Sequence, residues 1–104
     1  MAYRIDDVFS ALADQNRREI LLMLTDKKMT VNSIAENFKI SRPAISKHLK
    51  VLLNTNLVSS RQKGRERYYQ LNVEPLKQVR DWLKFYDKFW DTKLNSLINY
   101  LEEE

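Results

Sequence analysis

Basic side chains are concentrated in the middle of this chain. Residues 39–67 contain eight of them and a single acidic residue, so this segment carries a net charge of +7 in a chain whose net charge is +4. The basic residues are Lys39, Arg42, Lys47, Lys50, Arg61, Lys63, Arg65 and Arg67. Clustered lysine and arginine attract phosphate groups, so the segment predicts a polyanion-binding surface. An ordinary solvated basic face is the alternative.

Other kinds of site lack the residues that they need. The sequence has no cysteine, one histidine and one glycine among its 104 residues. Disulfides, thiolate metal sites and a cysteine nucleophile are therefore excluded, as are sites that need several imidazoles from one chain. A single glycine excludes the glycine-rich loops that bind nucleotide phosphates. No nucleophile–histidine–acid set or carboxylate pair stands out, so we predict that the protein is not an enzyme.

Length and composition fit one globular domain over residues 1–104. The 43% of hydrophobic and 31% of charged residues are ordinary for such a domain. No apolar run approaches the ~20 residues of a membrane-spanning helix. The first seven residues include Asp6 and Asp7 and lack the apolar stretch of a secretory signal. We therefore expect a cytoplasmic protein with no membrane contact and no cofactor.

Four helices are predicted before residue 55. The first covers residues 6–13 and the second about 15–24, with Asp14 as N-cap because its carboxylate accepts from free backbone amides. A very short strand at 29–30 precedes a third helix that starts at residue 31 or 32. The fourth helix runs from the N-cap Ser41 to about Asn54 and has an apolar side and a polar, basic side.

The polar side of the fourth helix carries candidate contacts to bases. A very short turn joins helices three and four, which is typical of a helix-turn-helix motif. The second helix of that motif enters the major groove, where arginine pairs with guanine and lysine reaches bases or phosphates. A helix N-terminus can also hold a phosphate. The candidate DNA contacts here are Ser41, Arg42, Pro43, Ser46, Lys47 and Lys50.

Residues 58–71 are predicted to form a β-hairpin. Residues at both ends favour strands, and the one glycine, Gly64, stands midway, where a hairpin tip needs a positive φ. The hairpin carries four further candidate DNA contacts, which would lie along the backbone or enter a minor groove. These are Arg61, Lys63, Arg65 and Arg67. A sheet edge that charge protects from aggregation is the alternative.

With these motifs the sequence resembles the ArsR/SmtB family of winged-helix bacterial repressors, over nearly all of residues 5–101. Residues 13–21 (ADQNRREIL) resemble the opening of the family's second helix. Residues 34–36 (IAE), 41–52 (SRPAISKHLKVL) and 56–58 (NLV) resemble its recognition signature, and residues 64–71 (GRERYYQL) resemble its wing. The fold expected is mainly α: a winged helix-turn-helix with four helices, a β-hairpin wing and a long C-terminal helix.

The metal sites of that family do not carry over to this chain. Its arsenic-type site uses cysteines of the third helix, where residues 30–32 (TVN) provide no thiolate. Its zinc-type site uses Asp and His of the last helix, which here offers Asp81, Asp87 and Asp91 without a histidine. We therefore predict a metal-independent member. His48 is expected to be a packed, hydrogen-bonded imidazole or a phosphate contact.

One long helix is predicted at the C-terminus, over residues 74–102. Its apolar stripe is wider than the ~100° that the terminal helix of a monomer buries, and it is rich in aromatic residues. We predict that this helix joins two copies in a homodimer, and the family resemblance adds the first helix to the contact. The candidate interface residues are Val8, Phe9, Leu83, Tyr86, Trp90, Leu94 and Leu97.

These features predict a homodimeric, sequence-specific DNA-binding transcriptional repressor. It would bind an imperfectly palindromic operator in double-stranded DNA and act by occluding the promoter. Two alternatives stay open. One is a repressor that responds to a small molecule bound at the aromatic C-terminal helix. The other is a winged-helix module that binds proteins and no DNA.

Overall fold

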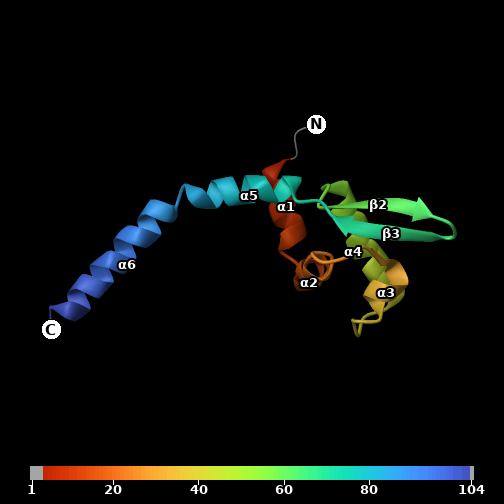
Figure 1. The fold of residues 1–104 in the computed structure, drawn as a ribbon, viewed down its shortest axis with the longest axis horizontal. Helices are drawn as coiled ribbons and strands as arrows, with labels where there is room; N and C mark the ends of the chain where they lie inside the picture. Colours follow the sequence, from red (N-terminus) through yellow and green to blue (C-terminus); the bar gives the residue numbers. More distant parts are fainter. Residues whose placement is uncertain (1–3, 104) are drawn as a thin grey trace.

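The computed structural model describes residues 4–103. In chain order its elements are α1 (Ile5–Leu12), α2 (Gln15–Met23), β1 (Met29–Thr30), α3 (Val31–Ala35), α4 (Arg42–Asn54), β2 (Val58–Lys63), β3 (Glu66–Leu71), α5 (Glu74–Lys84) and α6 (Asp87–Glu102). Helices α1 to α4 and the sheet form a body from which α5 and α6 extend (Figure 1). The predicted mainly α winged helix-turn-helix fold is confirmed.

Side-chain caps fix where the helices of the body begin. Asp14 Oδ1 accepts a hydrogen bond from the Arg17 amide at 3.1 Å, and Ser41 Oγ accepts from the Ala44 amide at 3.3 Å. Both predicted N-caps are therefore confirmed, and Thr30 caps α3 in the same way. The amide of Arg17 also lowers the pKa of the Asp14 carboxyl, because the hydrogen bond favours its charged form.

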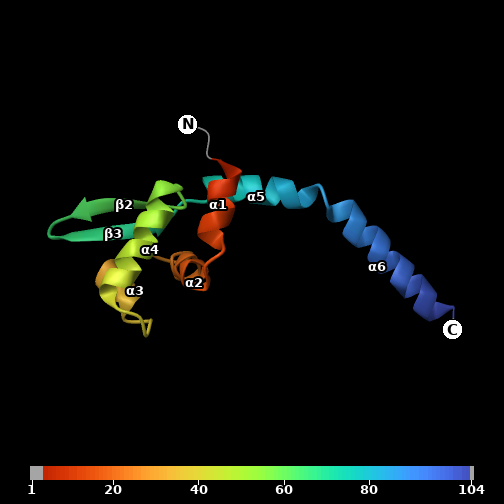
Figure 2. The same ribbon diagram turned by 180° about the vertical axis from the view of Figure 1, so that it is seen from behind.

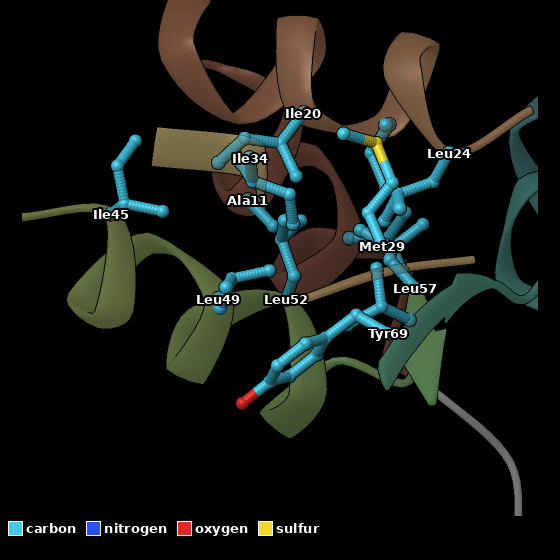
Figure 3. Close-up of a cluster of buried hydrophobic side chains, with 13 residues drawn as sticks. Ala11, Ile20, Leu24, Met29, Ile34, Ile45, Leu49, Leu52, Leu57 and Tyr69 are labelled. Atoms are coloured by element: carbon cyan, nitrogen blue, oxygen red, sulfur yellow. The ribbon is translucent and has the colours of Figure 1, made fainter. Parts of the chain in front are cut away.

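One apolar core holds the helices of the body against the sheet (Figure 3). Side chains from α1, α2, α3 and α4 meet Met29 of β1 and Tyr69 of β3 there. The buried residues of α4 recur at helical spacing, so one whole side of that helix faces inward. They are Ile45, Leu49 and Leu52.

A tight corner joins α4 to β2. The Leu57 amide donates to the Leu52 carbonyl at 2.9 Å, and the Asn56 amide donates to the Leu53 carbonyl at 3.0 Å. Asn56 has a φ of 60°, so these bonds form a Schellman motif with asparagine in the left-handed position. Leu52 and Leu57 are both fully buried. The corner therefore fixes the point at which the hairpin leaves the core.

Strand β3 is the centre of a three-stranded antiparallel sheet in the order β1-β3-β2. Strands β2 and β3 form the predicted hairpin, with Lys63 opposite Glu66 and a two-residue turn between them. Gly64, the predicted tip, has a φ of +64°. Strand β1 pairs with the other edge of β3, with Met29 opposite Tyr69. The sequence did not predict this second pairing.

The C-terminal segment does not form the single helix predicted for residues 74–102. It is divided into α5 and α6 at Phe85 and Tyr86. The amides of these two residues donate to carbonyls three positions back, of Trp82 and Leu83, at 3.2 and 2.9 Å. Aromatic residues have a weaker helix propensity than leucine or alanine. The Tyr86 ring packs edge-on against Trp82, four residues earlier, with centroids 5.3 Å apart.

Helix α5 crosses α1, whereas α6 leads away from the body (Figure 2). The α1–α5 crossing is held by an edge-on contact between Phe9 and Trp82, whose ring centroids are 5.1 Å apart. The radius of gyration is 18.3 Å, against about 13 Å for a compact domain of this length. Helix α6 has no buried residue. No helix within residues 4–103 is long and apolar enough to span a membrane.

The α4–β2 corner gives a test of the fold. Asn56→Ala should lower the free energy of unfolding by about 1 kcal/mol, because a left-handed backbone is costly for a residue with Cβ and least so for asparagine among them. Asn56→Gly should leave it unchanged or raise it slightly, because glycine adopts this φ without strain. Urea denaturation followed by circular dichroism measures both values. Equal stabilities for the two variants would contradict this account of the corner.

Candidate nucleic-acid interface

Helix α4 presents a polar face to solvent opposite its buried side. The six residues predicted there as DNA contacts are all exposed: Ser41, Arg42, Pro43, Ser46, Lys47 and Lys50. None of the three cations among them belongs to an ion pair within residues 4–103. Exposed short polar and basic side chains on one helix face suit the major groove, because they reach base edges without steric obstruction.

The turn before α4 completes the predicted helix-turn-helix. Helix α3 ends at Ala35 and α4 begins at Arg42, so residues 36–41 form a connection longer than the very short turn predicted, and the two helices pack against each other. The Asn37 side-chain amide donates to the Ser33 carbonyl at 2.9 Å, which occupies a free acceptor at the end of α3. The buried Ile34 and Ile45 join the two helices through the core. The core therefore holds both helices of the motif in place, and α4 presents its polar face to solvent.

The register of the wing places two of its cations on the outer face of the sheet. Arg61 lies opposite Tyr68 and Lys63 lies opposite Glu66, and side chains on directly opposed residues share a face. The alternate residues include the buried Tyr69, so they form the face toward the helices. Arg61 and Lys63 consequently point away from the core.

The other two predicted wing cations lie elsewhere. Arg67 is opposite Gln62, on the side of the sheet that faces the helices, and it donates to Ser60 Oγ at 2.8 Å. Arg65 is in the exposed two-residue turn at the tip. The four cations therefore surround the hairpin instead of lining one side of it. A wing of this kind can contact DNA through its tip and along either face.

A shallow hollow on the outer face adds a basic residue that the sequence did not single out. Lys28 lines this hollow of about 220 Å³ together with Arg61, Lys63 and Tyr68. The Tyr68 hydroxyl donates to Glu66 Oε2 at 3.0 Å, and this bond raises the pKa of Tyr68. Lys28 reaches the wing because β1, which follows it, pairs with β3. The position of Lys28 beside the wing follows from the β1–β3 pairing, which the sequence did not predict.

Known proteins resemble this chain over most of its length. The family described as "Bacterial regulatory protein, arsR family" matches residues 14–60. The transcriptional repressor SdpR of Bacillus subtilis (strain 168) is 41% identical over 79 residues, which cover 76% of this chain and 88% of SdpR. The chain belongs to the arsR family of bacterial regulatory proteins. It is a DNA-binding transcriptional regulator, and the family consists of regulators, not enzymes.

Further relatives support this membership of the ArsR family. The HTH-type transcriptional regulator Rv2034 of Mycobacterium tuberculosis (strain ATCC 25618 / H37Rv) is 37% identical over 99 residues, which cover 95% of this chain and 90% of Rv2034. The solved structure of an ArsR-like transcriptional regulator from Rhodococcus sp. RHA1 superposes with a TM-score of 0.76 at 33% identity. That match covers 96% of this chain and 92% of the other. The roles of individual residues on DNA stay predictions.

His48 lies between the polar and buried sides of α4. Its side chain is 18% exposed, and its Nδ1 accepts a hydrogen bond from Arg17 Nη1 at 3.3 Å. Asp14 Oδ1 is 4.0 Å from the same nitrogen. The prediction of a packed, hydrogen-bonded imidazole is therefore confirmed. Within residues 4–103, no three histidine, cysteine or acidic side chains are grouped in a way that could hold a metal ion.

The candidate dimer face differs from the prediction at one position. Five predicted residues of α5, α6 and their junction are exposed: Leu83, Tyr86, Trp90, Leu94 and Leu97. Phe9 is half-buried against Trp82. Val8 has no exposed surface, because it lies inside the core of its own chain, and so it offers nothing to a partner. The sequence could not distinguish the inner side of α1 from the outer one.

The wing supports a prediction about salt dependence. Replacing Lys63, Arg65 and Arg67 with alanine should weaken binding to every DNA sequence and lower the slope of log affinity against log salt by up to about 3. For each phosphate contact that is lost, binding releases about one counterion fewer from the DNA. Fluorescence anisotropy over a salt series measures the slope.

A matched control removes the same charge far from the wing. Lys77, Arg80 and Lys88 are exposed on α5 and α6, so their triple alanine variant should keep the wild-type slope. The single variants Lys28→Ala and Lys27→Ala compare the DNA affinity lost with a lysine that lines the hollow and with the lysine that precedes it in sequence. If the wing variant keeps the wild-type slope, the wing does not contact DNA.

Arg42 supports a prediction about specificity. Arg42→Ala should cost about 1–3 kcal/mol on the preferred site and much less on random DNA, because a bidentate contact to guanine is lost. Competition binding with both DNA types measures the difference. Equal losses on the two would make Arg42 a phosphate contact.

Proposed function

We propose that this ArsR family regulator is a homodimeric repressor that acts by occupying promoter DNA. The observation that carries the proposal is the uncovered apolar surface of α5 and α6. Trp90 is 66% exposed and Phe85 is 70% exposed, and further leucine, isoleucine and aromatic side chains extend the surface to the end of α6. Large contiguous apolar patches mark interaction sites, because water-exposed apolar area is unfavourable.

A second copy of the chain is the occupant that suits this surface best. The α1–α5 crossing places the α5 end of this apolar surface beside the body, so a two-fold pair of these helices would bring two bodies together. Two α4 helices would then face one side of the DNA. The operator would be an imperfect palindrome in double-stranded DNA, with half-site centres about one helical turn apart or a small multiple.

Repression by occlusion is supported by the names of related proteins and by the small set of elements in the fold. SdpR and the arsenical resistance operon repressors of Bacillus subtilis and Staphylococcus xylosus are named as repressors. In the described residues, the body and the C-terminal helices account for every element. A dimer bound across a promoter excludes other proteins from it without catalysis, metal or cofactor. We also propose that the protein is cytoplasmic.

A repressor that responds to a small molecule is a second candidate function. A hollow of about 530 Å³ lies at the α5–α6 junction, and its lining is aromatic and basic. The lining residues are Lys84, Phe85, Lys88, Phe89, Thr92 and Lys93. An apolar or aromatic anion would suit this lining. A thermal-shift screen of such compounds and of metal ions, repeated with operator DNA, tests the candidate.

The proposed function is tested by a gel shift on DNA upstream of its own gene, with sedimentation of the same sample. A repressor should bind as two chains per operator and lose affinity steeply as salt rises. Transcription in vitro from that promoter should fall when the protein is added. Absence of any DNA binding would favour a winged-helix module that binds proteins, and this would overturn the proposal.

Trp90 provides the test of assembly. Trp90→Asp should make the protein monomeric and abolish tight operator binding, because an unpaired charge in an apolar contact is strongly unfavourable. Sedimentation measures assembly, and circular dichroism reports whether the body stays folded. Asn95→Asp adds the same charge on another side of α6 and should stay dimeric. A folded, dimeric Trp90→Asp variant would remove this residue from the interface.

A further inference from the structure

Arg17 connects three helices of the body through its side chain alone. It lies in the first turn of α2, and its guanidinium contacts backbone carbonyls of α1 and the imidazole of α4. Helix α1 carries Phe9, which packs on α5 beside the proposed dimer face. Helix α4 carries the proposed base contacts. Arg17 is therefore placed between the assembly side and the DNA side of the molecule.

On the α1 side the contact is made to the end of the helix. Arg17 Nε donates to the Ala11 carbonyl at 2.7 Å, and Nη2 donates to the Ser10 carbonyl at 3.1 Å. Both carbonyls are in the last turn of α1, where carbonyls lack the usual partner four residues ahead in the helix. The Ser10 carbonyl also accepts from the amide of the C-cap residue Ala13, at 3.3 Å. The planar guanidinium makes both bonds from one side chain, which fixes its orientation.

On the α4 side the contact is made to His48. Arg17 Nη1 donates to His48 Nδ1 at 3.3 Å, which requires the imidazole proton to be on Nε2. His48 is next in sequence to the exposed Lys47 and to the buried Leu49. The imidazole therefore lies on α4 at the boundary between its buried side and the face that is proposed to read bases.

We infer that Arg17 is a positioning residue that sets the angle of α4 relative to the dimerising helices, and thereby the half-site spacing that the dimer accepts. This inference rests on the proposed function. Arg17 itself touches no DNA in it. Each added base pair moves a half-site by about 3.4 Å and rotates it around the duplex. A dimer with a fixed α4 angle binds well at one spacing only.

Arg18 provides a matched control within the same turn. Its Nη1 donates to the Leu12 carbonyl at 2.8 Å, so it also occupies a free carbonyl at the end of α1. It is exposed, and within residues 4–103 its hydrogen bond goes to α1 alone, whereas Arg17 also bonds to His48 of α4. Arg17→Lys and Arg18→Lys both keep the charge, so non-specific attraction to DNA is unchanged in either.

The first measurement is binding to a series of operators whose half-sites are moved apart or together by one and two base pairs. Arg17→Lys should lose about tenfold at the preferred spacing, the equivalent of a hydrogen bond to a charged group, and little on other spacings or on random DNA. The spacing profile should become flat. Arg18→Lys should keep the wild-type profile. His48→Leu should flatten it, whereas His48→Gln, which retains an acceptor, should restore it.

The second measurement needs no DNA. The chain has one histidine, so a ¹⁵N spectrum shows the nitrogens of one imidazole only. At mildly alkaline pH the wild type and Arg18→Lys should show the Nε2–H tautomer with Nδ1 as acceptor. Arg17→Lys should show a mixture of tautomers. Circular dichroism confirms that each variant is folded.

The outcomes separate the inference from the proposed function. Unchanged spacing profiles in Arg17→Lys and His48→Leu would overturn the inference, even if their thermal stability falls. An imidazole spectrum that Arg17→Lys leaves unchanged would overturn it as well. A wild-type protein that binds no palindrome at all would overturn the proposed function, and the half-site role of Arg17 would fall with it. The spectrum would then still report whether the Arg17–His48 contact exists.

Discussion

The packing of one side of α4 is the constraint on which the remaining structure depends. Ile45 and Leu52 have no exposed surface, and Leu49 has almost none. Burying three large aliphatic side chains stabilises the fold by several kcal/mol, at about 1.5–3 kcal/mol each. Because that side of the helix is fixed, its polar residues have to face solvent. The candidate DNA surface is therefore a consequence of the core, and so is the start of the wing, since Leu57 is buried next to Leu52 at the α4–β2 corner.

The C-terminal helices differ from the body in how much of their apolar surface their own chain buries. Helix α5 is tied to α1 by the Phe9–Trp82 contact, whereas α6 buries nothing against its own chain. This chain therefore combines a body with its own buried core and a C-terminal helix whose apolar side chains are exposed, where the proposed second copy would cover them. Arg17 lies within the body, where it bonds to α1, the helix that contacts α5, and to His48 of α4. Such hydrogen bonds are directional, which is why we infer a positioning role for this residue.

Much of the fold could be predicted because its signals are local. Asp14 and Ser41 mark helix starts three residues before the amides that they accept from. Gly64 marks the hairpin tip because that backbone conformation suits glycine. The spacing of Ile45, Leu49 and Leu52 identifies the buried side of α4, and by elimination its exposed candidate residues. Each of these signals lies within a few residues of the structure that it specifies.

The sequence by itself therefore determined the elements of the body, the polar face of α4 and the basic hairpin. Tertiary structure decided the rest. The pairing of β1 with β3 brings Lys28 to the wing, and the contact of Arg17 with His48 joins residues 31 positions apart. The inward orientation of Val8 and the break between α5 and α6 likewise depend on which surfaces meet. Periodicity specifies which residues share a side of a helix or strand, but only packing between distant segments decides what that side touches.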